Sequence, residues 1–350
     1  MKISKILSMA FAAILLVNVS CSRDEEVTQP KGAYENGIII ANEGGFSTPT
    51  ASISFTKEDL SSQENNIFSA NNNSAILGNV LQSIGFLGDN AYLVCNIPNK
   101  IEIVNRYSFK KVSTITAELD NPRYIAFSGN YVYVTNNNFS NVRKLNIYKN
   151  TDNSFVKSIN FEKYAERIVE AGGSIFIQTD GSTYDSNWNE LPTGHSISLL
   201  KSSSNNLEKT ITLTDDGIIK DLISSNGFAY VLSSTATESY IYKISPEGAF
   251  TKTVLTGING ASKLRIDNNN FYFNDNKKNI YSMSISSTNI PTKPIFTTTA
   301  NMYGFGVINN KIYVSNASFS QDSDVFVYNT SGTQLKTFKT GVGTNGFYKN

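Results

Sequence analysis

The sequence is poor in the side chains that build most enzyme centres: one histidine, one tryptophan and two cysteines among 350 residues. The single histidine, His195, excludes zinc and haem sites that need paired histidines. It also argues against Ser-His-Asp and Cys-His catalytic arrangements. Charge is sparse as well, with 30 Lys+Arg against 29 Asp+Glu. This balance predicts no nucleic acid or other polyanion as a partner.

Acidic side chains seldom lie close together in the sequence. The candidate catalytic pairs are Asp215 with Asp216, Asp322 with Asp324, and Glu25 with Glu26. Each pair lies in a polar stretch where solvated loop carboxylates are the norm, and the twelve-residue calcium-loop signature is missing. We therefore expect no catalytic residues, no metal and no cofactor, and predict that the protein is not an enzyme.

Asparagine and aromatic residues are abundant instead. The chain contains 43 Asn, 18 Tyr and 21 Phe. Asparagine favours turns and weakens helices, whereas aromatic residues fit the half-buried surfaces of sheets. This composition predicts short strands joined by many turns.

The N-terminus has the order of a bacterial export signal. Lys2 and Lys5 precede an apolar stretch, Met9 to Val19, that is short for a membrane span, and Ser20 and Cys21 follow. This order resembles a lipoprotein box, although Asn18 stands where leucine is usual. We predict a signal peptide at 1–20 and lipid attachment at Cys21. A signal peptide that merely contains a cysteine is the alternative.

A polar segment at 21–35 follows, and it is predicted to be a flexible tether. Its acidic cluster, Asp24, Glu25 and Glu26, is either solvated linker or a match to the Bacteroidota export signal that it resembles. The second interpretation predicts a lipoprotein of the outer membrane that faces the cell exterior. The only cysteine beyond Cys21 is Cys95, in the apolar run YLVC, so we expect a buried thiol and no disulfide.

One pattern recurs seven times in residues 36–350: a Gly or Asn turn, then about six apolar and aromatic residues that usually end in Asn, Ser, Thr or Asp. The runs start at residues 37, 91, 131, 174, 228, 270 and 311. A repeat of about forty residues matches one four-stranded propeller blade. The sequence therefore predicts an all-β fold, a single seven-bladed β-propeller.

The two ends of this region are predicted to meet. The C-terminal GTNGFYKN resembles DNPRYIAF, an inner strand, whereas the first run, NGIIIAN, has no inner strand before it. We expect the C-terminal strand, around Thr344 to Lys349, to complete the first blade and close the ring.

Several segments resemble YVTN-type propellers and, more closely, a Bacteroidota family of quinoprotein-like propeller lipoproteins. These segments are IIIANEGGF (38–46), LGNVLQSI (77–84), NKIEIVN (99–105), LDNPRYIAF (119–127) and YVYVTN (131–136). Within that family, one assigned relative that the chain resembles captures cobalamin during vitamin B12 uptake. The resemblance implies capture of cobalamin or another corrinoid at the cell surface and transfer to a TonB-dependent transporter.

In a propeller, the loops that leave each second strand and those that lead into each inner strand gather on one face around the channel. We expect this face to be rich in amides and aromatic rings, poor in net charge, and suited to a large polar ligand. Two insertions, after residue 42 and at 180–195, add to it. The candidate ligand-binding residues are Glu43, Phe46, Asn79, Asn96, Asn121, Arg123, Asn136, Phe139, Asp180, Trp188, Asp275, Tyr303 and Asn316.

Other interpretations remain open. The asparagines can simply cap turns, and Trp188 can pack the 180–195 insertion onto its own blade. The propeller can instead dock another cell-envelope protein without a small ligand. A carbohydrate lyase or hydrolase is the third alternative, and the shortage of histidine and clustered carboxylates disfavours it.

Overall fold

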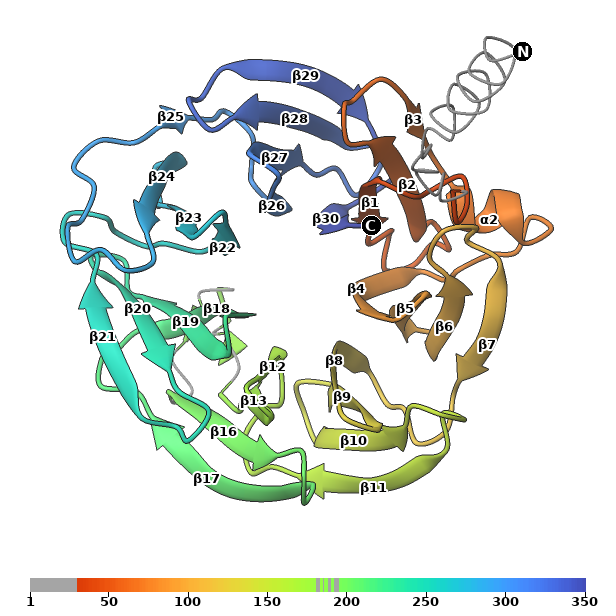
Figure 1. The fold of residues 1–350 in the computed structure, drawn as a ribbon, viewed down its shortest axis with the longest axis horizontal. Coiled ribbons are helices and arrows are strands. Elements are labelled where there is room, and N and C mark those ends of the chain that lie inside the picture. The colour runs from red at the N-terminus through yellow and green to blue at the C-terminus, as the bar shows by residue number, and fades with distance from the viewer. Residues whose placement is uncertain (1–29, 181–182, 185, 188–189, 192–194) are drawn as a thin grey trace, which may run out of the picture. The chain divides into compact units, whose positions relative to one another are not determined.

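A computed structural model describes residues 30–180, 183–184, 186–187, 190–191 and 195–350. Residues Gly32–Asn350 form one compact unit, in which seven four-stranded antiparallel sheets are arranged in a ring (Figure 1). The predicted propeller is therefore confirmed. No helix in the described ranges is long and apolar enough to cross a bilayer.

Blade 1 is built from both ends of this unit, as predicted. From the channel outward its strands are β30 (Thr344–Lys349), β1 (Gly37–Asn42), β2 (Ser52–Lys57) and β3 (Gln63–Glu64). Ile40 of β1 lies opposite Phe347 of β30 in an antiparallel ladder. Pairing the first and last strands in one sheet removes two exposed sheet edges.

Blades 2 to 4 follow the chain in order. Blade 2 contains β4 (Val80–Leu87), β5 (Asn90–Ile97), β6 (Asn99–Asn105) and β7 (Lys111–Ile115). Blade 3 contains β8 (Pro122–Ser128), β9 (Tyr131–Asn137), β10 (Arg143–Lys149) and β11 (Phe155–Asn160). Blade 4 contains β12 (Ile168–Ala171), β13 (Ser174–Gln178), β16 (Ser196–Lys201) and β17 (Asn206–Thr212), with a small hairpin inserted after β13, β14 (Thr183–Tyr184) and β15 (Glu190–Leu191).

Blades 5 to 7 repeat the same four-strand order. Blade 5 contains β18 (Ile218–Ser225), β19 (Phe228–Ser234), β20 (Ser239–Ile244) and β21 (Phe250–Val254). Blade 6 contains β22 (Leu264–Asp267), β23 (Asn270–Asn274), β24 (Asn279–Ser284) and β25 (Phe296–Thr297). Blade 7 contains β26 (Phe305–Ile308), β27 (Lys311–Asn316), β28 (Asp324–Asn329) and β29 (Gln334–Lys339).

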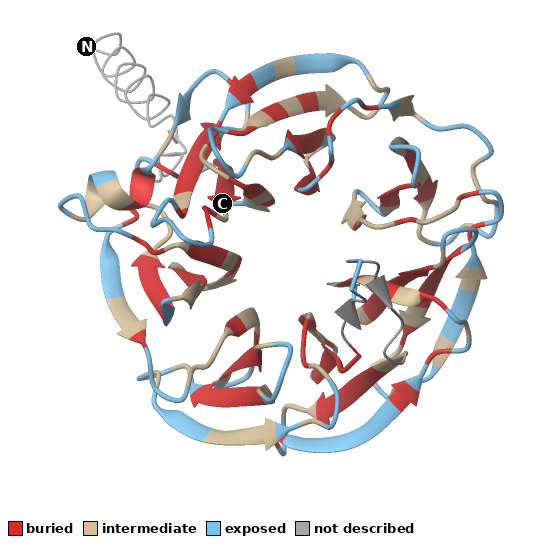
Figure 2. Cartoon of the chain, turned by 180° about the vertical axis from the view of Figure 1, so that it is seen from behind, coloured by how far each residue is buried: buried red, intermediate tan, exposed pale blue. Residues whose placement is uncertain are grey.

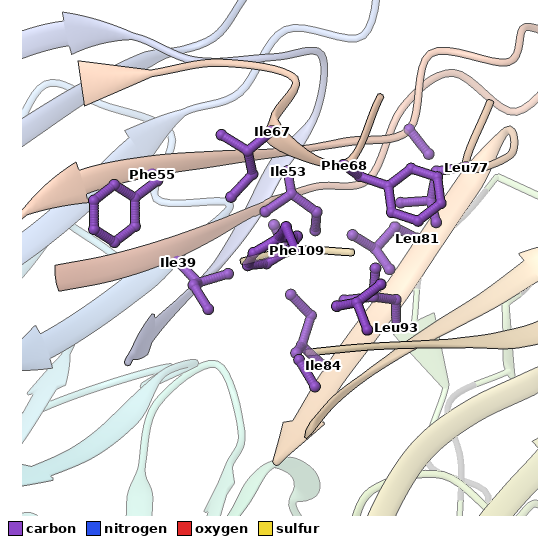
Figure 3. Close-up of a cluster of buried hydrophobic side chains, with 14 of the residues drawn as sticks. Ile39, Ile53, Phe55, Ile67, Phe68, Leu77, Leu81, Ile84, Leu93 and Phe109 are labelled. Atoms are coloured by element: carbon purple, nitrogen blue, oxygen red, sulfur yellow. The ribbon is translucent and has the colours of Figure 1, made fainter. Parts of the chain in front are cut away.

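The second and third strands of each blade supply most of the core, and the outer strands are largely exposed (Figure 2). Apolar side chains meet between neighbouring blades. Between blades 1 and 2, Ile39 and Phe55 pack in one cluster with Leu81 and Leu93 (Figure 3). Burial of such side chains between sheets is the main force that holds the blades together.

A short helix, α2 (Ile67–Asn71), fills the link between blades 1 and 2. The sequence gives almost no helical periodicity, and this helix was not expected. Its Ile67 and Phe68 are buried in the same inter-blade cluster. Tyr34, within the predicted tether, is also buried there against Phe55 and Phe109, so the packed part of the chain begins before residue 36.

Cys95 is fully buried in β5. Burial raises the pKa of its thiol to about 12, so the sulfur stays protonated and unreactive at neutral pH. The predicted buried thiol is confirmed. Cys21 lies outside the described residues.

Candidate functional site

A cavity of about 560 Å³ occupies the centre of the ring. It is lined by side chains from the inner strands, or from the residues next to them, in every blade. The polar residues that line it are Glu43, Gln82, Ser83, Arg123, Tyr124, Arg167, Asp221, Lys263, Arg265, Tyr303, Asn345 and Tyr348. A cavity of this size is typical of small-molecule sites.

Irregularities in the inner strands help to place these side chains. In blade 2 the ladder register shifts around Gln82, because Leu81 pairs with Cys95 and Ser83 with Val94. In blade 3 it shifts across Arg123 and Tyr124, where Thr135 Oγ1 accepts a hydrogen bond from the backbone N–H of Tyr124. A bulge leaves a residue unpaired and turns its side chain.

The first charged group in the cavity is Arg123. Its Nε donates to Glu166 at 3.1 Å, and its Nη1 donates to Gln82 at 2.7 Å. Glu166 also accepts a hydrogen bond from Asn137. Arg123 lies 5.0 Å from the ring centre of Phe139, within cation–π range. This network fixes one guanidinium at the mouth of the channel.

Asp221 pairs with two further guanidinium groups, which come from the blades on either side of it. Its carboxylate lies 3.4 Å from Nε of Arg167 and 2.7 Å from Nη1 of Arg265. It also accepts the backbone N–H of Leu264. Burial by itself raises the pKa of this carboxyl, but Arg265 and Arg167 bring the pKa below its usual value. Asp221 therefore remains ionised and holds blades 4, 5 and 6 together at the channel.

Glu43 and Tyr303 form a third polar contact. The hydroxyl of Tyr303 donates to Glu43 Oε2 at 2.5 Å. Burial raises the pKa of Glu43 and, together with the neighbouring Glu43, that of Tyr303. Both side chains were predicted to bind ligand, and the structure brings them together with Arg123 in one cavity.

Exposed aromatic rings lie close to residues that line the cavity. Phe46, Phe139 and Phe319 follow second strands of blades 1, 3 and 7, and are 77%, 47% and 53% exposed. Phe319 packs edge-on against Tyr303 at 5.1 Å, and Phe139 packs against Tyr164 at 5.9 Å. Exposed rings at the rim of a polar cavity offer stacking surfaces to a bulky ligand.

Several of the predicted ligand-binding residues make hydrogen bonds that stabilise the fold instead. Asn136 is fully buried, and its Oδ1 accepts the backbone N–H of Asp120 at 3.0 Å. Asn316 Oδ1 likewise accepts a hydrogen bond from the backbone N–H of Asn301. Asp275 accepts hydrogen bonds from two backbone N–H groups in its own turn. At these positions the capping interpretation describes the contacts.

The remaining predicted amides lie near the mouth but outside the lining of the cavity. Asn79 donates to the carbonyl of Phe46. Asn121 has a positive φ of 49° and its Nδ2 donates to Asp120. Asn96 contacts Gln82 at 3.4 Å, and its Oδ1 is buried without a partner. Trp188 lies outside the described residues.

Asp180 lies in a separate pocket of about 510 Å³ on blade 4, with His195. Asp180 is 3% exposed and pairs with Lys163 at 3.4 Å. His195 Nε2 lies 2.9 Å from Asp215 and 3.2 Å from Ser233, whose hydroxyl also donates to Asp215. In a catalytic triad the two ring nitrogens face different partners, whereas here one nitrogen faces both. Hydrogen bonding of this kind is structural.

Candidate metal ligands are sparse among the described residues, which contain no cluster of three or more His, Cys, Asp or Glu side chains that could hold a metal ion. The cavity is more charged than expected, with four cationic and two anionic side chains in its described lining. Arg167, Asp221, Lys263 and Arg265 were not predicted. Only a partial signal was present, because all four are charged residues within or just before inner strands in a chain with only 17% charged residues.

Comparison with solved structures finds many chains of similar fold. A quinoprotein alcohol dehydrogenase-like protein from Bacteroides thetaiotaomicron superposes with a TM-score of 0.70 at 12% identity, covering 90% of this chain and 78% of that one. A protein from Lactobacillus plantarum gives 0.64 at 12%, covering 89% and 98%. A functionally unknown protein from Desulfotomaculum acetoxidans gives 0.63 at 13%, covering 90% and 99%.

These likenesses show the fold alone. Identities of 12% to 13% carry no ligand or activity from one propeller to another. No protein-family model matches the sequence, and no curated protein matches it. The function of this protein must therefore be inferred from the cavity and its rim.

Proposed function

We propose that this protein is a lipid-anchored propeller of the outer-membrane surface that binds a bulky polar ligand at the channel mouth. The observation that supports binding is the 560 Å³ cavity, which gathers polar and aromatic side chains from all seven blades. The order of Lys2, Lys5, the apolar stretch and Cys21 supports the anchor. The acidic residues after Cys21 support the outer location.

The named candidate ligand is cobalamin or another corrinoid, with transfer to a TonB-dependent transporter. A corrinoid is too large to be enclosed by the cavity, so it would lie across the mouth. There its ring would contact Phe46, Phe139 and Phe319, and a polar substituent would enter the cavity. The fold permits this function, and the rim aromatics and the cavity support it.

Calorimetry with cyanocobalamin tests the proposal. We expect heat of binding at tens of micromolar from the wild type. Phe139→Ser should weaken binding about tenfold or more, because loss of an aromatic stacking contact costs about 1 to 3 kcal/mol. Phe155→Ser is the matched control, since Phe155 is an exposed phenylalanine on outer strand β11, and its removal should leave binding unchanged.

No heat from the wild type would contradict corrinoid capture. Equal weakening by Phe139→Ser and Phe155→Ser would contradict binding at the channel mouth.

A second candidate is docking of another cell-envelope protein on the same face. The exposure of Phe46, at 77%, and of Phe319 favours it, because large exposed apolar side chains are common at protein interfaces. Capture of an envelope protein that Phe46→Ser abolishes, together with no binding of cyanocobalamin, would favour this candidate.

A further inference from the structure

The charges around the channel do not cancel. Arg123, Arg167, Lys263 and Arg265 bring four positive charges to the cavity. Three carboxylates lie with them: Glu43 and Asp221 in the lining, and Glu166 behind Arg123. Within the described lining and its ion pairs, one positive charge is in excess. A cavity with this imbalance attracts anions.

Of these four cations, Lys263 is the one that no carboxylate of the described residues contacts. Glu166 pairs with Arg123, and Asp221 is shared by Arg167 and Arg265. Lys263 Nζ instead donates a hydrogen bond of 2.8 Å to the backbone carbonyl of Tyr303. It has no ion pair among the described residues. An ammonium group has three N–H donors, so this one has donors to offer a ligand.

The surroundings of Lys263 disfavour its charged form. Burial, together with the neighbouring Arg167 and Arg265, lowers the pKa of Lys263 to about 8, although Asp221 and Glu43 oppose the shift. A bound anion would reverse this effect, since an opposite charge at hydrogen-bond distance stabilises the ammonium. Affinity for an anion and the charge of Lys263 are thus linked.

Hydroxyl donors complete the cavity. Tyr124 accepts a hydrogen bond from Arg167 Nη1 at 2.7 Å, and Tyr348 accepts one from the backbone N–H of Ile84 at 3.3 Å. Among contacts between described residues, neither hydroxyl donates its own proton. Guanidinium, ammonium and phenol donors together suit the oxygens of a carboxylate or a phosphate.

We infer that the ligand carries an anionic oxygen group, a carboxylate or a phosphate, and that Lys263 binds this group in the channel beside Arg167 and Arg265. This inference rests on the proposed function, because it takes the channel as the place where the captured molecule binds. It also makes Lys263 the residue that distinguishes anionic from neutral ligands.

The test measures the melting temperature of the full chain, purified in detergent at pH 7, against concentration of citrate or inorganic phosphate. Potassium chloride at equal ionic strength is the reference. We expect a saturable rise for at least one of the two anions with the wild type, since a ligand that binds the folded state stabilises it. The anion that acts distinguishes a carboxylate site from a phosphate site.

Variants test whether Lys263 is responsible for the rise in melting temperature. Lys263→Met keeps a side chain of similar length and removes its charge. It should raise the apparent dissociation constant of the anion at least tenfold. Lys263→Arg should keep it within about threefold. Lys110→Met, an exposed lysine beside outer strand β7, should match the wild type. If Lys263→Met does not fold, Lys263→Gln replaces it.

Two outcomes of the melting experiment overturn the inference. One is the absence of a saturable shift with both anions. The other is an equal shift in the wild type and in Lys263→Met or Lys263→Gln. Cyanocobalamin binding that survives Lys263→Met would overturn the inference and leave the proposed function standing. A Lys263-dependent anion effect without cyanocobalamin binding would overturn corrinoid capture and leave the anion site standing.

Discussion

Thr344 Oγ1 donates a buried hydrogen bond of 2.7 Å to Oδ1 of Asn42, 302 residues away in the sequence. Thr344 begins the last strand and Asn42 ends the first. The same hydroxyl lies 2.5 Å from Thr340 Oγ1. This contact joins the two ends of the ring at the rim of the channel.

Removal of the Thr344 hydroxyl should destabilise the closure. Thr344→Val leaves Asn42 Oδ1 buried without its donor, which costs about 1 to 3 kcal/mol. Urea unfolding measures the loss, and Thr333→Val, at an exposed threonine, should show little change. Equal stability of the two variants would contradict a role for this contact.

Deletion of residues 341–350 tests closure as a whole. It removes β30 and exposes β1 as a free edge beside the cores of blades 1 and 7. We expect a large fall in the melting temperature, or aggregation. A deletion variant that melts like the wild type would contradict closure by the C-terminal strand.

Asp221 opposes the positive charge of the channel. Asp221→Asn leaves Arg167 and Arg265 without their shared carboxylate, and breaking a buried ion pair from one side costs about 3 to 5 kcal/mol of stability. The more positive channel should at the same time bind citrate more tightly. Urea unfolding and citrate titration measure these two effects, with Asp152→Asn in an exposed turn as the control. Weaker citrate binding by a folded Asp221→Asn would contradict the anion site.

Citrate binding should weaken as the pH rises above 7, because Lys263 loses its positive charge. Its pKa of about 8 means that raising the pH from 7 to 9 leaves about one tenth of the ammonium charged. The groups that surround it are Arg167, Arg265, Asp221 and Glu43, with Tyr303 supplying the carbonyl. Affinity should fall several-fold over this range in the wild type and stay level in Lys263→Arg. The same pH profile in both would show that Lys263 does not control binding.

Acid should destabilise the blade 4 and blade 5 contact through Asp215. Burial alone raises the pKa of this carboxyl, but hydrogen bonds from His195, Tyr242 and Ser233 lower it to about 2. A lowered pKa gives stability that is present above the unfolded value of 3.8 and is lost as the pH falls toward 2, about 2 kcal/mol in all. Melting temperatures between pH 5 and pH 2 should fall less steeply in Asp215→Asn. Parallel slopes would contradict this assignment.

The fold could be predicted from the sequence because each blade repeats one local pattern. Turn residues precede runs such as YVYVTN, and the alternation of turn and strand is set by nearby residues. Even the closing strand was visible, since GTNGFYKN resembles an inner strand. Helix α2 was not, because five residues stabilised by burial of Ile67 and Phe68 leave no periodic signal.

The site could be predicted only in part because the inner strands are irregular. Glu43, Arg123 and Tyr303 were found from their places at the ends of runs. Around Lys220 the ladder shifts register, with Ile219 opposite Ser233 and Asp221 opposite Leu232. A shift of one residue exchanges the two faces of a strand, so the sequence alone does not show which of the neighbours Lys220 and Asp221 faces the channel.

The central claim is that ligand binds at the channel mouth, and a crystal structure of the protein soaked with cyanocobalamin tests it most directly. We expect density across the mouth, against Phe139 and Tyr303, with an anionic oxygen of the ligand within hydrogen-bond distance of Lys263. Density on the outer strands alone, or an empty channel at saturating ligand, would contradict it.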